Sequence, residues 1–362
     1  MRVLSVGKDN RQRAMDSFMI KVSILGATGY TGSELLRFLL FHEQVEVVKV
    51  TSRTDIGIPV GQVHRNLYKL TNLTFTEENI EEIVELSDVV FLALPHGQAL
   101  EKVPQIFQAA KQKGIKVLDL GGDFRLKDPQ VFEKYYKLKH TAPEFLKKSV
   151  YGLTEFNREE IRKANLIACP GCFPTGALLA LLPLAKENLL TGDIVINSAT
   201  GSSGSGATPS EGTHHPERAY DYKAYNLFSH RHQPEIQQEL ERFNKSPIEV
   251  TLTTHSAPMV RGIFTTVYTR LSKEISEDQL RDLYRGYYEK EPFIRLVDQP
   301  RAAVVAGSNF CDISIASRGR KVIINSAIDN LVKGGSGQAV QNMNLMFGLD
   351  EKLGLGFPGT HP

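Results

Sequence analysis

The residue with the clearest chemical potential is a cysteine in a short turn. Cys172 lies within residues 167–175 (IACPGCFPT), between an apolar strand-like stretch and a long apolar stretch with helical character. This order predicts that Cys172 lies at or just before a helix N-terminus, where backbone N–H groups and the helix dipole favour a thiolate. Such a thiolate is a nucleophile. The same residues also fit a tight Pro-Gly turn with a buried, inert cysteine.

A nucleophilic cysteine needs a proton acceptor, and two histidines are the best candidates. His230 and His232 lie two residues apart in residues 229–236 (SHRHQPEI), directly before a helix that a proline begins. One imidazole can then face the thiolate while the other meets the substrate. A capped helix start with exposed histidines is the alternative interpretation of this motif.

Two arginines are candidates for binding an anionic substrate. Arg125 follows a predicted strand at residues 115–120, and Arg261 precedes another at residues 263–271. A guanidinium can hold a carboxylate or a phosphate with two parallel hydrogen bonds, although each arginine fits a surface ion pair equally well. No second C-x₂-C pair and no HExxH motif accompany the cysteines and histidines, so we predict no metal site.

A glycine-rich turn near the N-terminus predicts a nucleotide site. Residues 26–32 (GATGYTG) follow the first predicted strand and open the first helix. Glycines allow a tight turn and a close approach of the backbone to a pyrophosphate, which the helix N-terminus then binds. The spacing is G-x-x-G-x-x-G rather than G-x-G-x-x-G, and a turn that merely requires glycine is the alternative. The predicted cofactor residues of this turn are Gly26, Thr28, Gly29, Tyr30, Thr31 and Gly32.

The end of the second predicted strand indicates which nucleotide is bound. Ser52 and Arg53 occur where a cofactor with only ribose hydroxyls usually meets an Asp or Glu, and they suit a 2′-phosphate. We therefore predict NADP, although the nearby Asp55 keeps NAD open. Pro95 and His96 follow the strand predicted to end at residue 94, at the sheet edge where ligands bind. We interpret His96 as a loop residue near the cofactor rather than a catalyst.

The elements around these motifs predict two kinds of sheet. Strands and helices alternate over residues 21–120, which is typical of a parallel sheet with right-handed crossovers. After Cys172 the pattern changes to a long helix at residues 175–190 and then to strands of alternating polarity, typical of an antiparallel sheet with one covered face. The predicted fold class is α/β: a Rossmann-type parallel-sheet nucleotide domain plus an α+β catalytic domain with a mixed or antiparallel sheet.

The composition of the 362 residues excludes several functional classes. The formal net charge is +2, so no strong field indicates nucleic acid or an anionic membrane as a partner. Three cysteines do not make a disulfide framework, and no apolar run approaches the roughly 20 residues that span a bilayer. We expect a cytoplasmic protein with a small-molecule substrate, and we expect residues 1–20 to be a flexible extension outside the fold.

Taken together, these motifs resemble those of the N-acetyl-γ-glutamyl-phosphate reductase family, the NADPH-dependent semialdehyde dehydrogenases of arginine biosynthesis. The resemblance covers nearly everything from residue 20 onward, with the family's motifs in the same order. They are GATGYTG, the LPHG turn, GGDFR, YGLTE, PGCFPT, HRHQPEI, VRG and SAIDNLVKGGSGQAVQN. PGCFPT together with HRHxPE is the most specific part of the match.

The resemblance implies how the chain is divided. A nucleotide domain comprises residues 21–171 and 333–362, so that a C-terminal helix completes it. A catalytic and oligomerisation domain at residues 172–332 lies between these two parts. The resemblance also implies a homodimer or a homotetramer.

The resemblance further implies a reaction with an acyl phosphate as the small-molecule substrate. The cysteine matching Cys172 attacks the acyl group, phosphate leaves, and hydride from NADPH reduces the thioester to an aldehyde. A thioester accepts hydride more readily than a carboxylate, so covalent catalysis divides one difficult reduction into two steps. His230 is the expected acid/base, His232 is expected near the substrate, and Gly335 and Gln338 are expected near the nicotinamide.

One departure from the family pattern concerns Cys169, which occupies a position where Asn or Ser is common. It creates a C-x-x-C sequence with Cys172, a spacing found in thioredoxin-like redox motifs. A thioredoxin-like fold is not expected, because a dinucleotide-binding pattern of roughly 150 residues precedes it. A non-catalytic NADP-binding sensor with a redox disulfide between these two cysteines remains an alternative function.

The second departure is the loop of residues 201–216 (GSSGSGATPSEGTHHP), which replaces the Ser-Gly-Ala-Gly-Arg sequence usual in the arginine pathway. The loop resembles that of relatives which reduce aminoadipyl phosphate bound to a carrier protein in lysine biosynthesis. An arginine expected to position the substrate is absent there, and Arg218 is a candidate to replace it. Ser203, within this loop, is also predicted to bind substrate. A carrier-bound acyl phosphate is therefore the alternative substrate.

Overall fold

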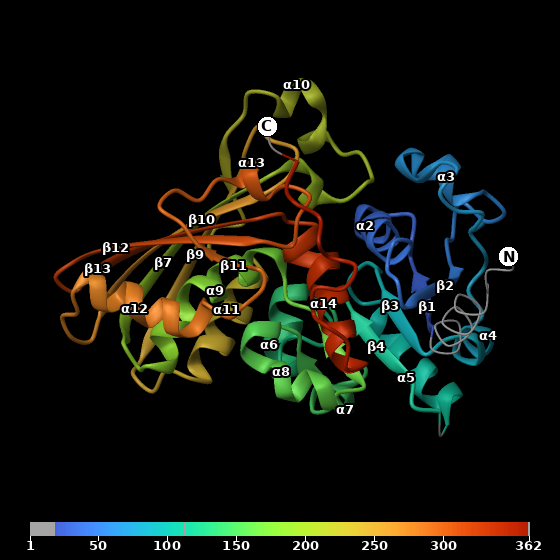
Figure 1. Ribbon diagram of the computed structural model, residues 1–362, viewed down its shortest axis with the longest axis horizontal. Helices are drawn as coiled ribbons and strands as arrows, with labels where there is room; N and C mark the ends of the chain where they lie inside the picture. Colours follow the sequence, from blue (N-terminus) through green and yellow to red (C-terminus); the bar gives the residue numbers. More distant parts are fainter. Residues whose placement is uncertain (1–18, 112, 361–362) are drawn as a thin grey trace, which may run out of the picture.

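The computed structural model describes residues 19–111 and 113–360, and its elements are arranged around two separate sheets (Figure 1). A six-stranded parallel sheet holds the N-terminal half, and a seven-stranded mixed sheet holds most of the C-terminal half. The predicted fold class is confirmed. Most of the predicted N-terminal extension lies outside the described residues, but Ile20 already begins the first strand.

The six-stranded sheet is parallel throughout, with the strand order β2-β1-β3-β4-β6-β5. Helices cover both of its faces, and all four residues of the apolar VVFL strand are buried. The carboxyl ends of β1, β2, β3, β4 and β6 each lead into a turn that carries predicted site residues. The strands are β1 (Ile20–Leu25), β2 (Val45–Val50), β3 (Val89–Leu92), β4 (Lys116–Asp119), β5 (Val150–Tyr151) and β6 (Leu166–Ala168).

The helices of this half begin with residues whose side chains or backbone geometry suit a helix start. Asn79 and Asp128 each accept a backbone N–H of the first turn, as polar N-caps do. The first helix instead begins after Gly29, and no side chain caps it. The helices are α2 (Tyr30–Leu39), α3 (Val60–Val63), α4 (Ile80–Leu86), α5 (Ala99–Ala110), α6 (Pro129–Tyr136), α7 (Pro143–Leu146) and α8 (Thr154–Lys163).

The seven-stranded sheet has the strand order β11-β12-β13-β10-β7-β9-β8. The sheet is mixed because β9 pairs parallel to β7 and β11 pairs parallel to β12, whereas the other pairs are antiparallel. Alternation within a strand reveals a covered face but not the direction of its neighbour. The strands are β7 (Leu190–Thr200), β8 (Lys223–Tyr225), β9 (Ile248–Ser256), β10 (Ile263–Leu271), β11 (Ile294–Leu296), β12 (Cys311–Arg318) and β13 (Lys321–Ile328).

One face of this sheet is covered by a helix that begins at the predicted nucleophile. The helix α9 (Cys172–Lys186) is buried from Phe173 to Ala185 and forms the centre of the core with the inward residues of β7, β10 and β13. Its apolar residues surround the whole helix, as expected for a central helix. The opposite face exposes Tyr268 and Ile323 by about 45% and 41%. The remaining helices are α10 (His215–Arg218), α11 (His232–Glu241), α12 (Glu277–Tyr288) and α13 (Ala302–Val305).

The C-terminal helix lies at the junction of the two sheets. The π-helical turn η4 (Val332–Ser336) leads directly into α14 (Gly337–Met346), whose residues are all buried. α14 packs against α2, α8 and β4, so the end of the chain returns to the nucleotide half (Figure 1). The predicted domain limits stay predictions, although they fall close to the starts of α9 and η4. Within the described ranges, no helix is long and apolar enough to span a bilayer.

Candidate active site

Cys172 lies at the start of α9, immediately after the turn that leaves β6. Gly171 is the N-cap in an extended conformation, and no side chain caps the helix. Gly334 of η4 packs against the cysteine, because a Cβ at that glycine would lie 2.8 Å from the Cβ of Cys172. The side chain is partly buried and borders a cavity. Cys172 therefore lies at a helix N-terminus, as the sequence predicted.

Two buried charges hold the turn before Cys172 from either side. The Nε of Arg125 donates to the carbonyl oxygen of Cys169 at 2.7 Å. The backbone N–H of Gly171 donates to Oε1 of Glu235 at 2.8 Å, and the hydroxyl of Tyr151 donates to the same oxygen at 2.7 Å. Nη1 of Arg125 lies 3.5 Å from Oε2 of Glu235. The conformation of this turn is thus fixed by the segment after β4, by β5 and by α11.

The surroundings of Cys172 act against the thiolate that its helix position favours. Burial raises the pKa of the Cys172 thiol above its usual value, and the charge of Arg125 and the backbone N–H of Phe173 offset this only in part. The sequence predicted a thiolate from the position at the helix start alone, without the effect of this burial. The thiol must therefore lose its proton to a neighbouring base when it reacts.

Two neutral imidazoles border the same cavity as Cys172. Burial lowers the pKa of His230 to about 4, and burial with the neighbouring charges lowers that of His232 well below its usual value. Nδ1 of His230 accepts the backbone N–H of His232 at 3.1 Å, which leaves its Nε2 for a ligand. Nδ1 of His232 is buried without a hydrogen-bond partner. Each ring therefore keeps one nitrogen that no described protein group binds.

The cavity that contains these groups has a volume of about 440 Å³. Arg218 borders it, and two of its hydrogen bonds go to the backbone oxygens of Thr200 and Ala257. Its Nε is buried without a partner, so a donor remains for an anionic ligand. The loop of residues 201–216 and β8 supply half of the remaining lining residues. The cavity thus brings together Cys172, His230, His232 and Arg218.

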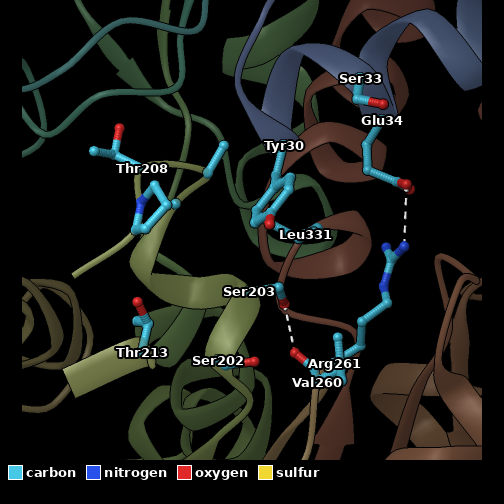
Figure 2. Close-up of a pocket in the computed structure, with 13 residues that line it drawn as sticks. Tyr30, Ser33, Glu34, Ser202, Ser203, Thr208, Thr213, Val260, Arg261 and Leu331 are labelled. Carbon is cyan, nitrogen blue, oxygen red and sulfur yellow. Dashed lines mark hydrogen bonds and ion pairs between the residues drawn. The ribbon is translucent and has the colours of Figure 1, made fainter. Parts of the chain in front are cut away.

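Three predicted substrate residues lie outside this cavity. Arg125 is about 4% exposed and occupied by backbone oxygens and Glu235 behind the turn. Arg261 and Ser203 line a different cavity of about 390 Å³, between α2 and residues 202–213 (Figure 2). There the Ser203 hydroxyl donates to the oxygen of Val260 at 2.7 Å, and Arg261 pairs with Glu34.

The predicted phosphate-binding turn borders a larger cavity of about 620 Å³. Gly26, Thr28 and Gly29 line it, together with Ser52, Arg53 and Pro95. A Cβ at Gly26 would lie 2.6 Å from the oxygen of Ala93, and this residue has a φ of +76°, so a side chain has no room there. The N-terminus of α2 has no side-chain cap, which leaves its backbone N–H groups for a phosphate.

The other residues of this turn have different surroundings. Tyr30 projects into the cavity shared with Arg261 (Figure 2). The oxygen of Thr31 accepts the hydroxyl of Ser336 at 2.9 Å, which ties α2 to η4. A Cβ at Gly32 would lie 2.5 Å from the backbone of Ala27, so this glycine allows the helix to pack on its strand.

Of the two residues predicted to select NADP over NAD, Arg53 is available to a ligand and Ser52 is not. Arg53 is exposed at the cavity edge, where its guanidinium is available to a 2′-phosphate. The Ser52 hydroxyl donates to Asp55 and accepts the N–H groups of Thr54 and Asp55, so it organises the turn. Oδ2 of Asp55, the carboxylate that had kept NAD open, thus has a partner within the turn.

The residues expected near the nicotinamide lie at the junction. Gln338 is buried, and its amide nitrogen donates to the oxygen of Gly152 and to Thr154, while its Oε1 has no partner. Gly335 belongs to η4 and follows Gly334, the residue that packs against Cys172. His96 accepts the N–H of Gly122 through Nδ1 and packs edge-on against Tyr136, and its pKa is lowered to about 3, mainly by burial.

These features fit a dinucleotide better than a metal ion. The open helix N-terminus provides donors, Gly26 provides space, and the unpartnered Oε1 of the buried Gln338 provides an acceptor. Residues 207 and 208 border both the nucleotide cavity and the one next to it. In the described part of the chain, no group of three His, Cys, Asp or Glu residues is placed to hold a metal ion.

Comparison with known proteins gives two family models that divide the chain. The model "Semialdehyde dehydrogenase, NAD binding domain" matches residues 21–164, and "Semialdehyde dehydrogenase, dimerisation domain" matches residues 172–330. A protein of Pelotomaculum thermopropionicum named N-acetyl-gamma-glutamyl-phosphate reductase is 49% identical over 349 residues, which cover 95% of this chain and 99% of that protein. A protein of the same name from Methanopyrus kandleri is also 49% identical, over 95% of this chain and its own full length. The chain belongs to the N-acetyl-γ-glutamyl-phosphate reductase family.

Solved structures agree with this family at the level of the fold. Aspartate semialdehyde dehydrogenase II from Vibrio cholerae has a TM-score of 0.67 at 18% identity, covering 91% of this chain and 98% of its own. The aspartate semialdehyde dehydrogenase of Candida albicans, solved with NADP, has a TM-score of 0.65 at 13% identity with the same coverage. At these identities the likeness describes the fold alone.

Sequence reasoning missed several residues of this N-acetyl-γ-glutamyl-phosphate reductase family member. Glu235 lies three residues after His232 on the same helix face, so its position in HRHQPE was a usable signal. Tyr151 belongs to the YGLTE motif but had no assigned role. Lys223 and Tyr225 of β8 line the catalytic cavity, and nothing in their sequence context indicates that.

Proposed function

We propose that this chain reduces N-acetyl-γ-glutamyl phosphate to N-acetylglutamate semialdehyde and phosphate, with NADPH, through a thioester on Cys172. The observation that carries the proposal is one cavity in which the cysteine at the start of α9 meets two neutral imidazoles and a free arginine donor. The names of relatives with 49% identity over nearly their full length support the choice of substrate.

The first half of the reaction needs an attacking sulfur and a departing phosphate. The thiol of Cys172 passes its proton to a neutral imidazole as the sulfur bonds to the acyl carbon, and the carbon–oxygen bond to phosphate then breaks. Nδ1 of His232 has no hydrogen-bond partner and is the ring atom available to take this proton, whereas Nδ1 of His230 already accepts a backbone N–H. Arg218 supplies a cationic donor for the substrate's anionic groups.

The second half requires a hydride at the thioester carbon, which NADPH supplies when it is bound. The carbonyl oxygen gains negative charge in this step, and backbone N–H groups at the start of α9 with the Nε2–H of His230 suit its stabilisation. Because Nδ1 of His230 accepts a backbone N–H, its neutral ring carries the proton on Nε2. Collapse of the adduct releases the aldehyde and returns the Cys172 thiolate.

The decisive experiment follows the reaction in reverse. NADP, phosphate and N-acetylglutamate semialdehyde should give NADPH absorbance, and NAD should be a poorer acceptor. In a substrate panel, carrier-linked aminoadipate semialdehyde should be much less active. A higher activity with the carrier-linked compound would move the assignment to that substrate, and no reduction with any compound would leave a nucleotide-binding sensor.

We also propose a cytoplasmic homodimer or homotetramer. The family model for residues 172–330 is described as a dimerisation domain, and the uncovered face of the seven-stranded sheet carries half-exposed Tyr268 and Ile323. Apolar residues on an uncovered sheet face suit burial against a second copy. Light scattering should give a mass of two or four chains, and a monomer at micromolar concentration would contradict it.

A further inference from the structure

Arg261 forms an ion-pair cluster that joins the two halves of the molecule. Its Nε and Nη2 donate to the carboxylate of Asp329 at 2.8 and 3.2 Å, and its Nη1 donates to Oε1 of Glu34 at 3.1 Å. Figure 2 shows Glu34 descending from α2 to meet this guanidinium. The other oxygen of Glu34 accepts Nη2 of Arg37 at 2.7 Å. All three nitrogens of Arg261 are therefore bound to carboxylates.

Each carboxylate of the cluster is close to one reactive part of the site. Glu34 lies on the first turns of α2, whose N-terminus is the proposed phosphate site. Asp329 lies where β13 ends, and its backbone oxygen accepts the N–H of Gly334 at 2.9 Å. Gly334 is the residue that packs against Cys172. The cluster thus connects the nucleotide helix with the backbone beside the nucleophile.

The charge of the cluster argues against a role for Arg261 in binding the substrate. Asp329 is fully buried and also accepts the N–H groups of Gly307, Leu331 and Val332. Burial alone would raise the pKa of Glu34, but hydrogen bonds from Arg261 and Arg37 outweigh it and lower that pKa. Glu34 is therefore charged at neutral pH, and each guanidinium nitrogen of Arg261 already donates to a carboxylate rather than to an anionic ligand.

Buried ion pairs contribute little net stability, and their better-supported use is to specify one arrangement of the parts that they join. In this chain the parts are the helix that would hold the cofactor and the segment beside Cys172. Acylation uses Cys172, the two imidazoles and Arg218, all on the catalytic side. Hydride transfer alone depends on the position of one half relative to the other.

We propose that Arg261 is a positioning residue that fixes the nucleotide helix relative to Cys172 and thereby supports hydride transfer, not acylation. This inference rests on the proposed function, because it assigns Arg261 to one of its two steps. It acts through Glu34 and Asp329 and does not touch the reacting atoms.

The test separates the two half-reactions in Arg261→Gln and Glu34→Gln. Phosphate released from N-acetyl-γ-glutamyl phosphate without NADPH measures acylation, and NADPH oxidation by the preformed acyl-enzyme measures hydride transfer. We expect acylation within about threefold of wild type and hydride transfer reduced about 30- to 100-fold, since a misplacement of about 1 Å can cost that much. The double variant should be no slower than Arg261→Gln, because both changes remove the same link.

Arg295→Gln is the matched control, since it removes an ion pair with Asp312 that joins two strands of the seven-stranded sheet and not the two halves of the molecule. It should leave both steps unchanged. Thermal unfolding checks that each variant is folded, and Arg261→Lys replaces Arg261→Gln if that variant does not fold. Equal losses in both steps, or an unchanged hydride step, would overturn the proposal.

A readout without turnover keeps the two proposals distinguishable. Bound NADP should protect Cys172 of the wild-type protein from alkylation by iodoacetamide, and it should protect Arg261→Gln less at saturating NADP. Equal protection would overturn the role of Arg261 even if no acyl phosphate is a substrate. Absence of phosphate release by the wild-type protein would instead refute the proposed function.

Discussion

Two turns at the carboxyl edge of the six-stranded sheet have the same local construction and different surroundings. One leads from β1 to α2 and the other from β6 to α9. Each ends in an N-cap glycine, Gly29 or Gly171, with extended backbone angles and no side-chain cap. The first turn opens onto a cavity of about 620 Å³, whereas the N–H of Gly171 is bound by the buried carboxylate of Glu235.

The difference shows that a helix N-terminus acquires its chemistry from what covers it. At Gly29 the free N–H groups and the helix dipole suit a phosphate. At Gly171 the nearest donor already has a partner, and burial raises the pKa of the cysteine that follows. The second turn therefore presents a protonated nucleophile that depends on His230 and His232, while the first presents an anion site.

The largest expected effect comes from removing the sulfur that only the second turn carries. Cys172→Ala should reduce turnover by about 10⁴-fold or more, because the covalent route is lost. Binding of NADPH, measured by fluorescence titration, should stay within about threefold, because the cofactor site is at the other turn.

Cys169→Ala is the matched control for that loss. Cys169 is about 1% exposed, and burial raises its pKa, so it is not expected to react. Most of the activity should remain. Equal losses in the two variants would mean that Cys169 has a role in the reaction and would favour the redox pair.

A smaller effect should distinguish two glycines within the first turn. Gly32→Ala places a Cβ 2.5 Å from the backbone of Ala27, which should lower the free energy of unfolding by about 1–3 kcal/mol. Gly29→Ala meets no atom within 4 Å, so its stability should change by less than about 1 kcal/mol.

If a phosphate binds this turn, Gly29→Ala should weaken NADPH binding more than Gly32→Ala does, the opposite of their order in stability. The new methyl group of Gly29→Ala points into the cavity, and it should weaken NADPH binding about tenfold. Urea unfolding and fluorescence titration of both variants supply the two measurements. An unchanged NADPH affinity for Gly29→Ala would place the pyrophosphate elsewhere.

Features that depend on local sequence order were predictable in this chain. The parallel sheet follows from buried strands that alternate with helices, and Cys172 at a helix start follows from a turn between two apolar segments. The family motifs added the roles of His230 and Gln338, which stay predictions. His230 borders the cavity that contains Cys172, and Gln338 is buried in α14.

Features that depend on long-range packing were not predictable. Arg125 and Arg261 carry the same chemistry in sequence, but one is enclosed behind the catalytic turn and the other lies between two carboxylates from distant segments. The parallel pairing of β7 with β9 likewise depends on the path of residues 201–247 and not on either strand. The burial that raises the pKa of Cys172 comes from η4 and α11, far along the chain.

The next effect in size should show whether the cavity beside the first turn prefers NADPH to NADH. Arg53 is exposed beside the nucleotide cavity, so Arg53→Ala should reduce the preference for NADPH over NADH about tenfold, or about 1.4 kcal/mol. The ratio of kcat/KM for the two cofactors measures this preference. Arg65→Ala, an exposed arginine outside the cavity, should leave the ratio unchanged. A similar loss in both variants would point to a general charge effect.

The smallest expected effect concerns the imidazole beside the second turn. The pKa of His230 is lowered to about 4, so its ring gains no charge when the pH falls from 8 to 5. The alkylation rate of Cys172 should follow only the ionisation of its own thiol, whose pKa is raised, and should decrease steadily as the pH falls. The ratio of this rate in wild type to that in His230→Gln should stay within about twofold over this range, because an inflection near 6.5 requires a ring that titrates there. Such an inflection would mean that the imidazole is more open to water than its packing against Phe173 and Tyr225 indicates.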